Sequence, residues 1–242
     1  MKPFEGKYAL ITGAGSGIGR DTALLLAERG AKGIIIADLN LDSAVKAAEE
    51  ITTATGCECL PFKVDVSIPS EIEALFAFAG EKFGTIHILV NSAGVLNYLS
   101  IDEVNVDVWD KTLNINLRGT YLCAREALKY MKAQNYGKII NVSSSAGRIG
   151  GIAAGIDYTA SKGGVIAMTY SLAKLGAAHN INVNGVAPGI IETPLSKNRP
   201  PAPGVKVGLP RDVSTAIVFL ASDEANHITG CTLDINGGTY MH

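Results

Sequence analysis

The sequence signals its chemistry most clearly through a tyrosine and a lysine one helical turn apart. Tyr158 and Lys162 begin a stretch with helical periodicity, which places the phenol and the ammonium on the same face. A free phenol has a pKa of ~10 and exchanges protons poorly at neutral pH, but a nearby ammonium favours the phenolate and lowers that pKa. The hydroxyls of Ser143, Ser144 and Ser145, which end the preceding predicted strand, could hold a carbonyl oxygen beside the pair. These residues indicate proton transfer, although a tyrosine and a lysine at this spacing often belong to a solvated helix face.

A glycine-rich turn lies between the first predicted strand and the first predicted helix. Small residues let the backbone turn tightly and approach a pyrophosphate, which the free amides and the positive dipole end of the helix stabilise. Such a turn can be purely structural, but its place in the first strand-helix-strand unit favours dinucleotide binding. Within the run Thr12 to Gly19, the candidate contacts are Gly13, Ser16, Gly17, Ile18 and Gly19.

An acidic residue ends the second predicted strand. Asp38 stands 19 positions beyond Gly19, where a carboxylate accepts hydrogen bonds from the adenosine ribose. It could instead cap the following helix, but Asn40 and Asp42 are available for that role. The residues that end the third and fourth predicted strands fit either ligand contacts at the same edge or ordinary turns. They are Asp65, Val66, Asn91, Ala93 and Gly94.

Short β-branched runs alternate with longer stretches of helical period along the chain. This alternation predicts a parallel sheet with helices on both faces, which is a doubly wound Rossmann-type α/β fold. The predicted strands are Tyr8 to Thr12, Ile34 to Asp38, Pro61 to Val66, Ile86 to Asn91, Lys138 to Ser143, Asn182 to Val186 and Cys231 to Ile235. The predicted helices are Ile18 to Arg29, Leu41 to Thr53, Pro69 to Phe83, Val108 to Ala133, Tyr158 to Ala178 and Val213 to Ala221.

One domain is expected to hold residues 1–242, because α/β folds reach this length in one piece. The run Asn198 to Gly208 is rich in proline and glycine. It predicts a surface loop, because the helix and strand after it are too short to fold alone. We expect residues 190–211 to form a substrate-side loop within the domain.

The composition excludes several classes of protein. Apolar residues at 47% and charged residues at 18% exclude a disordered chain and a coiled coil. A net charge of −2 gives no footprint for nucleic acid or an anionic membrane. The apolar runs fall far short of the ~20 residues of a membrane span, and no signal-peptide core is present, so a cytoplasmic location is expected. Reduced cysteines are expected there, and Cys57 and Cys59 lack a second ligand pair, so no metal site is expected.

Together these motifs resemble those of the short-chain dehydrogenase/reductase family in its compact single-domain form. The resemblance covers Lys7 to Gly238 and includes two further motifs, Asn114-Ile115-Asn116 and Pro188-Gly189. It implies that Tyr158 is the acid/base, that Lys162 binds the nicotinamide ribose and lowers the tyrosine pKa, and that Asn116 holds a proton-relaying water. The implied catalytic tetrad is Asn116, Ser144, Tyr158 and Lys162.

The resemblance also implies further cofactor contacts. Asp65 and Val66 would bracket the adenine, and Ile191 and Thr193 would contact the carboxamide. The other implied contacts of the nicotinamide half are Tyr158, Lys162, Pro188 and Gly189.

Ser144 is the preferred serine, because Gly147 follows it by three positions as in the family's Ser-x-x-Gly context. Its separation from Tyr158 is then 14 positions, one more than is common, so Ser145 remains an alternative.

We therefore expect an NAD(H)-dependent oxidoreductase that interconverts a small-molecule secondary alcohol and a ketone, as a homotetramer by resemblance. One alternative is a 3-oxoacyl-thioester reductase; another, of a different class, is a non-catalytic dinucleotide-sensing protein, which would not need Tyr158 and Lys162. Reductases of acyl-carrier-protein thioesters tend to carry basic residues where this chain has Asn135 and His179, which weakens the first alternative. The stretch Ser196 to Leu209 is short and proline-rich where the family has a helical substrate lid, so the substrate is not inferred from it.

Overall fold

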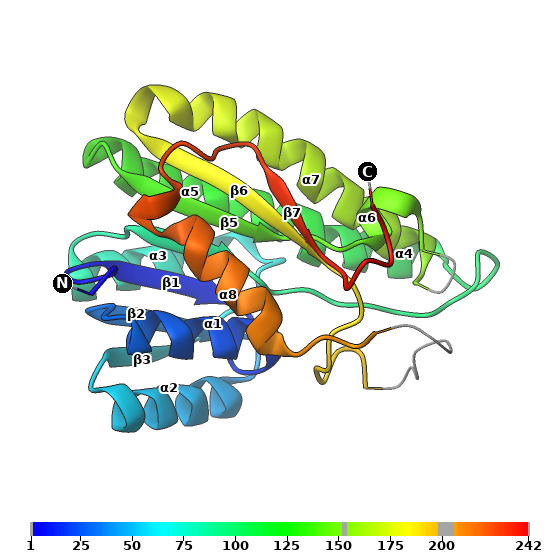
Figure 1. Ribbon diagram of the computed structural model, residues 1–242. Coiled ribbons are helices and arrows are strands. Elements are labelled where there is room, and N and C mark those ends of the chain that lie inside the picture. Colours follow the sequence, from blue (N-terminus) through cyan, green and yellow to red (C-terminus); the bar gives the residue numbers. More distant parts are fainter. Residues whose placement is uncertain (1, 152–153, 198–205, 242) are drawn as a thin grey trace.

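A seven-stranded parallel sheet forms the centre of the computed structural model, which describes residues 2–151, 154–197 and 206–241 (Figure 1). The strands lie in the order β3-β2-β1-β4-β5-β6-β7, and every neighbouring pair is parallel. Their bounds are β1 (Tyr8–Thr12), β2 (Gly33–Asp38), β3 (Glu58–Lys63), β4 (Ile88–Asn91), β5 (Gly137–Val142), β6 (Ile181–Pro188) and β7 (Thr232–Ile235).

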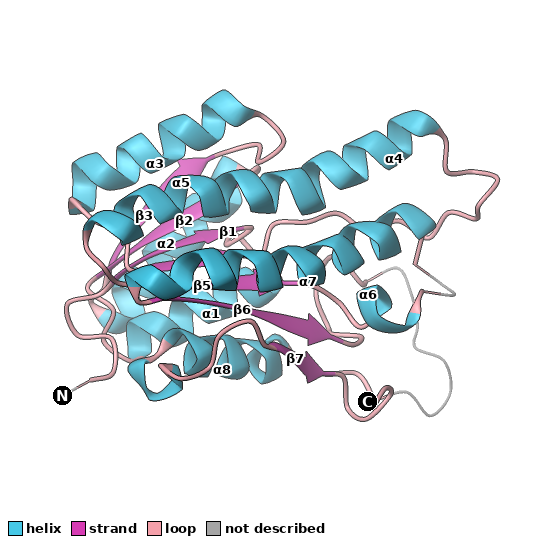
Figure 2. Cartoon of the chain, turned by 90° about the horizontal axis from the view of Figure 1, so that it is seen from above, coloured by secondary structure: helices cyan, strands magenta, loops and turns pink. Residues whose placement is uncertain are grey.

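Helices cover both faces of this sheet, which confirms the predicted doubly wound fold. Helices α1, α2 and α8 share one hydrophobic core with the sheet, and α3, α5 and α7 share the core on the other face (Figure 2). The α-helices are α1 (Gly17–Glu28), α2 (Leu41–Thr55), α3 (Pro69–Phe83), α4 (Val106–Leu113), α5 (Thr120–Ala133), α6 (Ala146–Ile149), α7 (Ile156–Gly176) and α8 (Pro210–Ala221). One π-helical segment, η1 (Asn114–Gly119), and two 3-10 turns, η2 (Ala177–His179) and η3 (Asp223–Ala225), complete the described helices.

The central strands are apolar along their whole length because each of their faces meets a helical layer. Along β2, Ile34 and Ile36 belong to the core with α1, α2 and α8, whereas Ile35 belongs to the core with α3, α5 and α7. All three isoleucines are fully buried. A parallel sheet covered on both sides requires such continuous apolar runs in place of alternation.

The strand order reverses between β1 and β4, and this reversal creates the place for a ligand. From β1 the chain crosses to β2 on one side, whereas from β4 it crosses to β5 on the other side. Loops that leave the two strands in opposite directions open a crevice at their carboxyl ends. The predicted glycine-rich turn follows β1, and Ala93 and Gly94 follow β4, so both border this crevice.

Two predicted elements differ from the structure. The third strand spans Glu58–Lys63, not Pro61 to Val66, so Asp65 and Val66 lie in the loop after the strand. Pro61 fits inside β3 because this strand is the edge of the sheet, where a residue without an N–H is tolerated. The long helix predicted from Val108 is instead α4, η1 and α5 in succession, because η1 inserts a π-helical bulge.

The predicted substrate-side loop, 190–211, is described only in part, because residues 198–205 lie outside the described residues. An isolated β-bridge joins its two described ends at Ile191 and Gly208. Across the described segments, we find no helix with the length and apolar character needed to cross a membrane.

Candidate active site

A cavity of about 860 Å³ runs along the carboxyl edge of the sheet. It extends from Asp38, at the end of β2, to Tyr158, in the first turn of α7, and passes the loops after β1, β4, β5 and β6. Its volume suits a bound small molecule or cofactor. The predicted site residues that line it are Gly13, Ser16, Gly17, Ile18, Asp38, Asp65, Val66, Ala93, Gly94, Ser144, Tyr158, Lys162, Pro188, Gly189, Ile191 and Thr193.

The glycine-rich turn fits an anionic group at the N-terminus of α1. Gly13 has a φ of +65°, and a Cβ there would come within 2.8 Å of the Ala93 Cα atom. A Cβ on Gly19 would collide with the Gly13 carbonyl oxygen, so Gly19 shapes the turn from behind and does not line the cavity. The Ser16 side chain makes no capping hydrogen bond within the described chain, which leaves the first amides of α1 for a ligand.

The crevice also leaves room in front of the lysine. A Cβ on Gly94 would lie 3.6 Å from Lys162 Nζ and 3.2 Å from Asn116 Oδ1. Glycine at this position therefore keeps open the space through which a bound group could reach the ammonium. Together with the turn after β1, this opening fits the extended shape of a dinucleotide.

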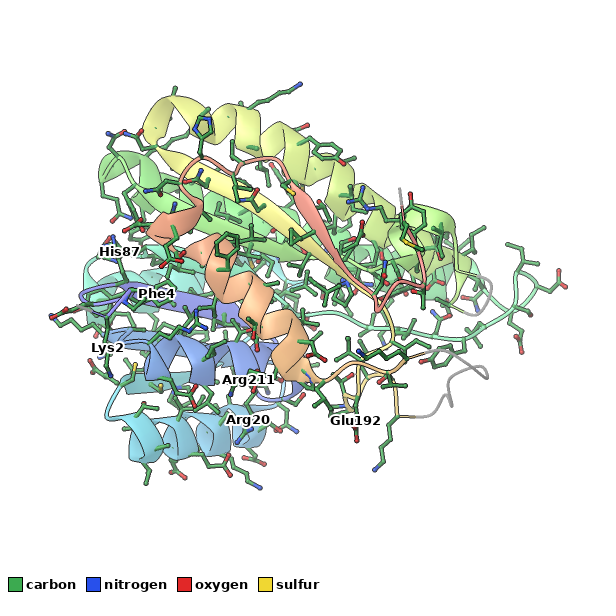
Figure 3. The ribbon with its side chains drawn as sticks, viewed as in Figure 1. Lys2, Phe4, Arg20, His87, Glu192 and Arg211 are labelled. Atoms are coloured by element: carbon green, nitrogen blue, oxygen red, sulfur yellow. The ribbon has the colours of Figure 1, made fainter. Side chains whose placement is uncertain are left out.

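A carboxylate stands at the far end of the cavity. The two oxygens of Asp38 accept hydrogen bonds from the backbone N–H groups of Gly15 and Asn40, each at 2.9 Å. Arg20, the one basic residue near the turn in sequence, forms an ion pair with Glu50 of α2 and does not line the cavity (Figure 3). This end of the cavity therefore presents a carboxylate and, among the described lining residues, no basic side chain beside it.

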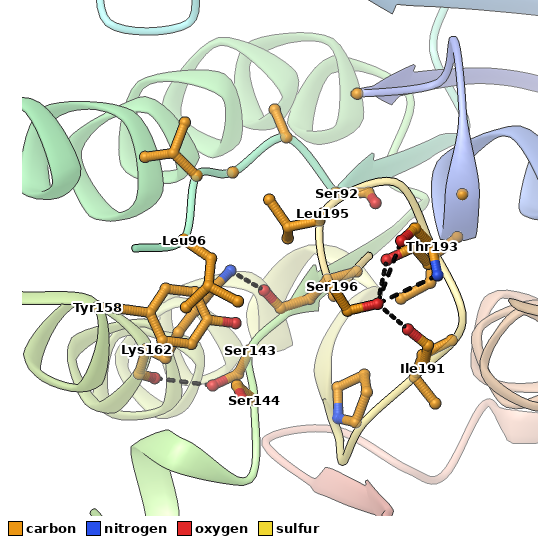
Figure 4. A pocket seen from close by; sticks show the side chains of 18 of the residues that line it. Ser92, Leu96, Ser143, Ser144, Tyr158, Lys162, Ile191, Thr193, Leu195 and Ser196 are labelled. Atoms are coloured by element: carbon orange, nitrogen blue, oxygen red, sulfur yellow. Dashed lines mark hydrogen bonds between the residues drawn. The ribbon is translucent and has the colours of Figure 1, made fainter. Parts of the chain in front are cut away.

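Tyr158 is a buried phenol whose oxygen faces the cavity (Figure 4). Burial raises its pKa, contact with the Ser144 hydroxyl lowers it, and the nearby Tyr98 phenol raises it. The net direction is upward, whereas the sequence predicts that the lysine lowers this pKa. Burial is the larger effect because a phenolate loses its hydration in an apolar site.

Lys162 is also buried, with only 5% of its surface exposed. Its Nζ atom donates a hydrogen bond to the Val142 carbonyl oxygen at 2.8 Å and lies 5.7 Å from the centroid of the Tyr158 ring. Burial lowers the pKa of Lys162 to about 8. The ammonium therefore stands beside the phenol, but its own charge is disfavoured by the same apolar surroundings.

The three serines after β5 occupy different environments. Ser143 is buried and donates its hydroxyl to the Lys162 carbonyl oxygen at 2.7 Å, so that hydroxyl is already engaged. Ser144 contacts the Tyr158 phenol, and its Oγ accepts a hydrogen bond from the Ala146 amide at 3.1 Å. Ser145 is held through its backbone N–H, which donates to the Pro188 carbonyl oxygen at 2.9 Å. Of the three hydroxyls, that of Ser144 is the one placed against the phenol.

Two predicted site residues brace the walls without lining the cavity. Asn116, in η1, is fully buried and bonds both backbone groups of Val95, accepting from the N–H at 2.8 Å and donating to the carbonyl at 2.9 Å. Its Nδ2 also donates to Ser161 Oγ at 3.1 Å. Asn91 donates to Asn141 Oδ1 at 2.9 Å beneath the sheet edge. These amides fix the loop after β4 relative to β5 and α7.

Several lining residues were not predicted. Most come from the loops after β4 and β6 and from α6, whereas Leu39 follows β2 and Ile115 lies in η1, and most are apolar. A search for residue types that carry out chemistry overlooks apolar side chains. The signal that would have found most of them is their position just after strands that end at the crevice. They include Leu39, Val95, Leu96, Tyr98, Ile115, Ile149, Ile190 and Leu195.

Comparison with known proteins assigns the chain to a family. The profile described as short chain dehydrogenase matches residues 7–203. The chain belongs to the short-chain dehydrogenase family. It is accordingly an oxidoreductase that uses a nicotinamide dinucleotide and acts on CH–OH donors. No geometric feature of the site conflicts with that chemistry within the described chain.

The relatives of this short-chain dehydrogenase are named for different activities. The 3-oxoacyl-(acyl-carrier-protein) reductase FabG of Thermotoga maritima is 40% identical, with 97% of this chain and 98% of the relative covered. Cyclohexanol dehydrogenase of an Acinetobacter strain is 36% identical, with coverage of 97% and 95%. The crystal structure of levodione reductase superimposes with a TM-score of 0.91 at 30% identity and covers 98% of this chain and 100% of that one.

The buried lysine predicts a pH-dependent stability. Its pKa is about 8 in the folded protein and ~10.4 in an unfolded chain, so between these values the unfolded state binds more protons and stability rises with pH. Below pH ~8 the folded protein carries the buried ammonium, which lowers its free energy of unfolding by about 3 kcal/mol relative to the neutral amine. In urea unfolding of the cofactor-free protein from pH 7 to 9.5, the stability of wild type relative to Lys162→Met should rise above pH ~8. The exposed Lys174→Met variant is the control, and a pH-independent difference for Lys162→Met would contradict the burial argument.

Proposed function

We propose that this short-chain dehydrogenase is specific for NAD(H) and interconverts a small secondary alcohol and a ketone, with Tyr158 as the acid/base. The observation that carries the proposal is the convergence of Tyr158, Ser144 and Lys162 at one end of a cavity whose other end is Asp38. Between the two ends lies the glycine-rich turn. A dinucleotide bound along this cavity would have its nicotinamide at the proton-transfer end and its adenosine ribose at the Asp38 carboxylate.

Each side chain at the reacting end has a defined task. When bound, the nicotinamide supplies or accepts the hydride. In ketone reduction, Tyr158 donates its phenolic proton to the carbonyl oxygen, and Ser144 donates a hydrogen bond to the same oxygen. The raised pKa keeps the phenol protonated at neutral pH, ready to act as an acid. In alcohol oxidation the phenolate takes the hydroxyl proton, and the Lys162 ammonium stabilises that phenolate.

We assign the cofactor contacts from the residues that line the cavity. The amides at Ser16, Gly17 and Ile18 would hold the pyrophosphate at the N-terminus of α1. Asp38 would accept from the adenosine ribose. The remaining contacts that we assign to the cofactor are Gly13, Asp65, Val66, Ala93, Gly94, Lys162, Pro188, Gly189, Ile191 and Thr193. Gly19, Asn91 and Asn116 would act from behind, by shaping the turn and the loop after β4.

A 3-oxoacyl-thioester reductase is the second candidate, because the relative from Thermotoga maritima carries that name. The reduction of the keto group of such a thioester would use Tyr158, Ser144 and Lys162 in the same roles. Asn135 and His179, where basic residues would receive the acyl carrier protein by resemblance, weigh against it. A non-catalytic sensor is disfavoured, because it would need no proton-transfer group, and the buried Tyr158 phenol against Ser144 is such a group.

The assembly and the compartment remain predictions. By family resemblance we infer a homotetramer, which sedimentation analysis would test. We also infer a cytoplasmic location, with which the four free cysteines agree, since reducing compartments keep thiols unpaired.

Removal of the phenolic hydroxyl tests the proposed acid/base. Tyr158→Phe should lower kcat by ~10²-fold or more, because general acid/base catalysis contributes ~10²–10⁴-fold. NADH affinity, measured by fluorescence titration, should change little. Tyr170→Phe on the exposed side of α7 is the matched control and should keep full activity. A folded Tyr158→Phe protein with most of its kcat at every pH would refute the assignment.

The serines can be separated by the same assay. Ser144→Ala should lower kcat/KM by ~10²–10³-fold, the usual effect of losing one donor to a developing oxyanion. Ser145→Ala should have a much smaller effect, because its position is fixed through the backbone. The reverse ranking would assign the oxygen-holding role to Ser145.

The cofactor preference should depend on Asp38. A 2′-phosphate would face a like charge there, and a discrimination of ~1–3 kcal/mol, or ~5–150-fold in favour of NADH, is expected at the solvent-exposed pocket edge. Asp38→Ala should narrow or invert this preference, and Asp38→Asn, which removes the charge alone, should relieve the repulsion. Asp42→Asn in the first turn of α2 serves as the control. Equal kcat/KM for both cofactors in the unmodified protein would remove Asp38 from the cofactor site.

A further inference from the structure

The cavity changes character between its two ends. Its carboxylates, Asp38 and Asp65, follow β2 and β3 at the end away from the phenol. Around Tyr158 the wall comes from the loop after β4, from α6 and from the loop after β6, and its side chains are mainly apolar (Figure 4). The main ones are Leu96, Tyr98, Ile149, Ile190 and Leu195.

On the described parts of these segments and beside them, three charged side chains lie outside the cavity lining. Arg148 of α6 forms an ion pair with Asp234 at 3.3 Å and donates to the Thr232 carbonyl oxygen at 2.7 Å. Asp157, next to the phenol in sequence, is fully buried and bonded to Asn97. Glu192 is exposed on the outer side of the loop after β6 (Figure 3). Among the described lining residues, Lys162 is the sole cation, and it is already bonded to Val142.

The polar side chains at this end are few and mostly engaged. Ser143 donates to the Lys162 carbonyl, and Ser196 donates to the carbonyl of Ile191. Tyr158 and Ser144 remain directed at the cavity, and both would bind the single reacting oxygen. The wall thus offers donors to the reacting oxygen and mainly apolar surface to the rest of the substrate.

The chain beside Tyr98 is tied to the start of α7, next to the apolar end of the cavity around Tyr158, which we call the chamber. The neighbouring Asn97 donates to Asp157 Oδ2 at 2.6 Å, accepts from the Gly155 N–H through its backbone carbonyl at 3.0 Å, and accepts from the Leu99 N–H at 3.2 Å. A Cβ on Gly155 would collide with Asn97 and Asp157, so the contact is tight. Tyr98 itself is 38% exposed while lining the cavity. The start of α7 therefore positions both the reacting phenol and this aromatic wall.

We propose that this chamber selects ketones and alcohols whose carbon skeleton is apolar and carries no ionised group, and that Tyr98 is the wall that sets its selectivity. The inference rests on the proposed function and adds the substrate class to it. A carboxylate or phosphate entering the chamber would lose hydration and, among the described lining residues, would meet no cation other than Lys162, whose Nζ already donates to Val142. An apolar skeleton instead gains by leaving water. The orientation of the substrate then follows from its one oxygen, held by Tyr158 and Ser144.

Matched pairs of neutral and anionic ketones test the substrate class. Each pair shares one skeleton, for example methyl 5-oxohexanoate and 5-oxohexanoate, with a cyclic pair of cyclohexanone esters and acids beside it. The neutral member should show kcat/KM higher by ~5-fold or more, because burying a charge without a partner costs more than burying a neutral group of the same skeleton. Equal rates, or faster turnover of the anion, would overturn the inference while leaving the proposed function in place. No turnover of any pair, with NADH bound, would instead refute the proposed function.

Charge introduced into the wall provides the converse test. Leu195→Lys should raise kcat/KM for the anionic member by ~10-fold, because an ammonium at the chamber wall supplies the missing partner. Leu175→Lys, on the exposed surface of α7 away from the cavity, is the matched control and should change neither member. If both lysines act alike, the wall has no part in the selection.

The role of Tyr98 is tested by measuring whether its substitution changes KM, kcat or both. Tyr98→Ala should raise KM for the neutral ketone by ~10-fold while NADH affinity stays the same, because the lost ring surface lies at the substrate end of the cavity. Tyr98→Phe should restore most of that loss, since the wall is defined by the ring. Tyr121→Ala, an exposed tyrosine of α5, controls for general destabilisation. An unchanged KM in Tyr98→Ala, or a parallel loss of NADH affinity, would contradict the assignment.

Discussion

The close approach of two backbones at the reversal of the sheet sets the geometry of everything around it. Gly13 comes so near to Ala93 that no side chain fits between them, and Thr12 Oγ1 accepts from the N–H groups of Ser92 and Ala93 at 3.3 Å each. This contact fixes the turn after β1 against the loop after β4. The N-terminus of α1 then opens toward one half of the cavity, and the space before Lys162 opens toward the other.

The burial of Tyr158 and Lys162 lowers the stability of the fold and shifts the pKa values of both groups. The same apolar surroundings that raise the pKa of Tyr158 lower that of Lys162, so burial disfavours both charged forms. Natural active sites accept such a loss where the perturbed group serves the reaction. Here the pKa of Lys162 moves toward neutral pH, whereas the raised pKa of Tyr158 keeps the phenol a proton donor. The structure compensates with braces behind the site, where Asn116 ties Val95 to Ser161 and so holds the loop after β4 to α7.

The fold was largely predictable because its strands and helices have strong local periodicity, and the errors lie where a neighbour overrides the local pattern. Pro61 lies inside β3 only because that strand is an edge, which no local pattern reveals. The π-helical η1 interrupts a run that is helical by composition, so a single helix was expected. Asp65 and Val66 still reach the cavity from the loop after β3, because the carboxyl edge, and not the last strand residue, positions them.

From the sequence alone one can predict the doubly wound class, the glycine-rich turn, Asp38 as a candidate and the pairing of Tyr158 with Lys162, since each depends on residue types at short spacing. The tertiary structure decided which serine meets the phenol, because Ser143 and Ser144 differ only in what packs against them. It also decided the direction of the tyrosine pKa, which depends on how far neighbouring layers exclude water. The apolar chamber around Tyr98 is likewise absent from any local pattern, because its walls come from loops that meet only when the sheet forms.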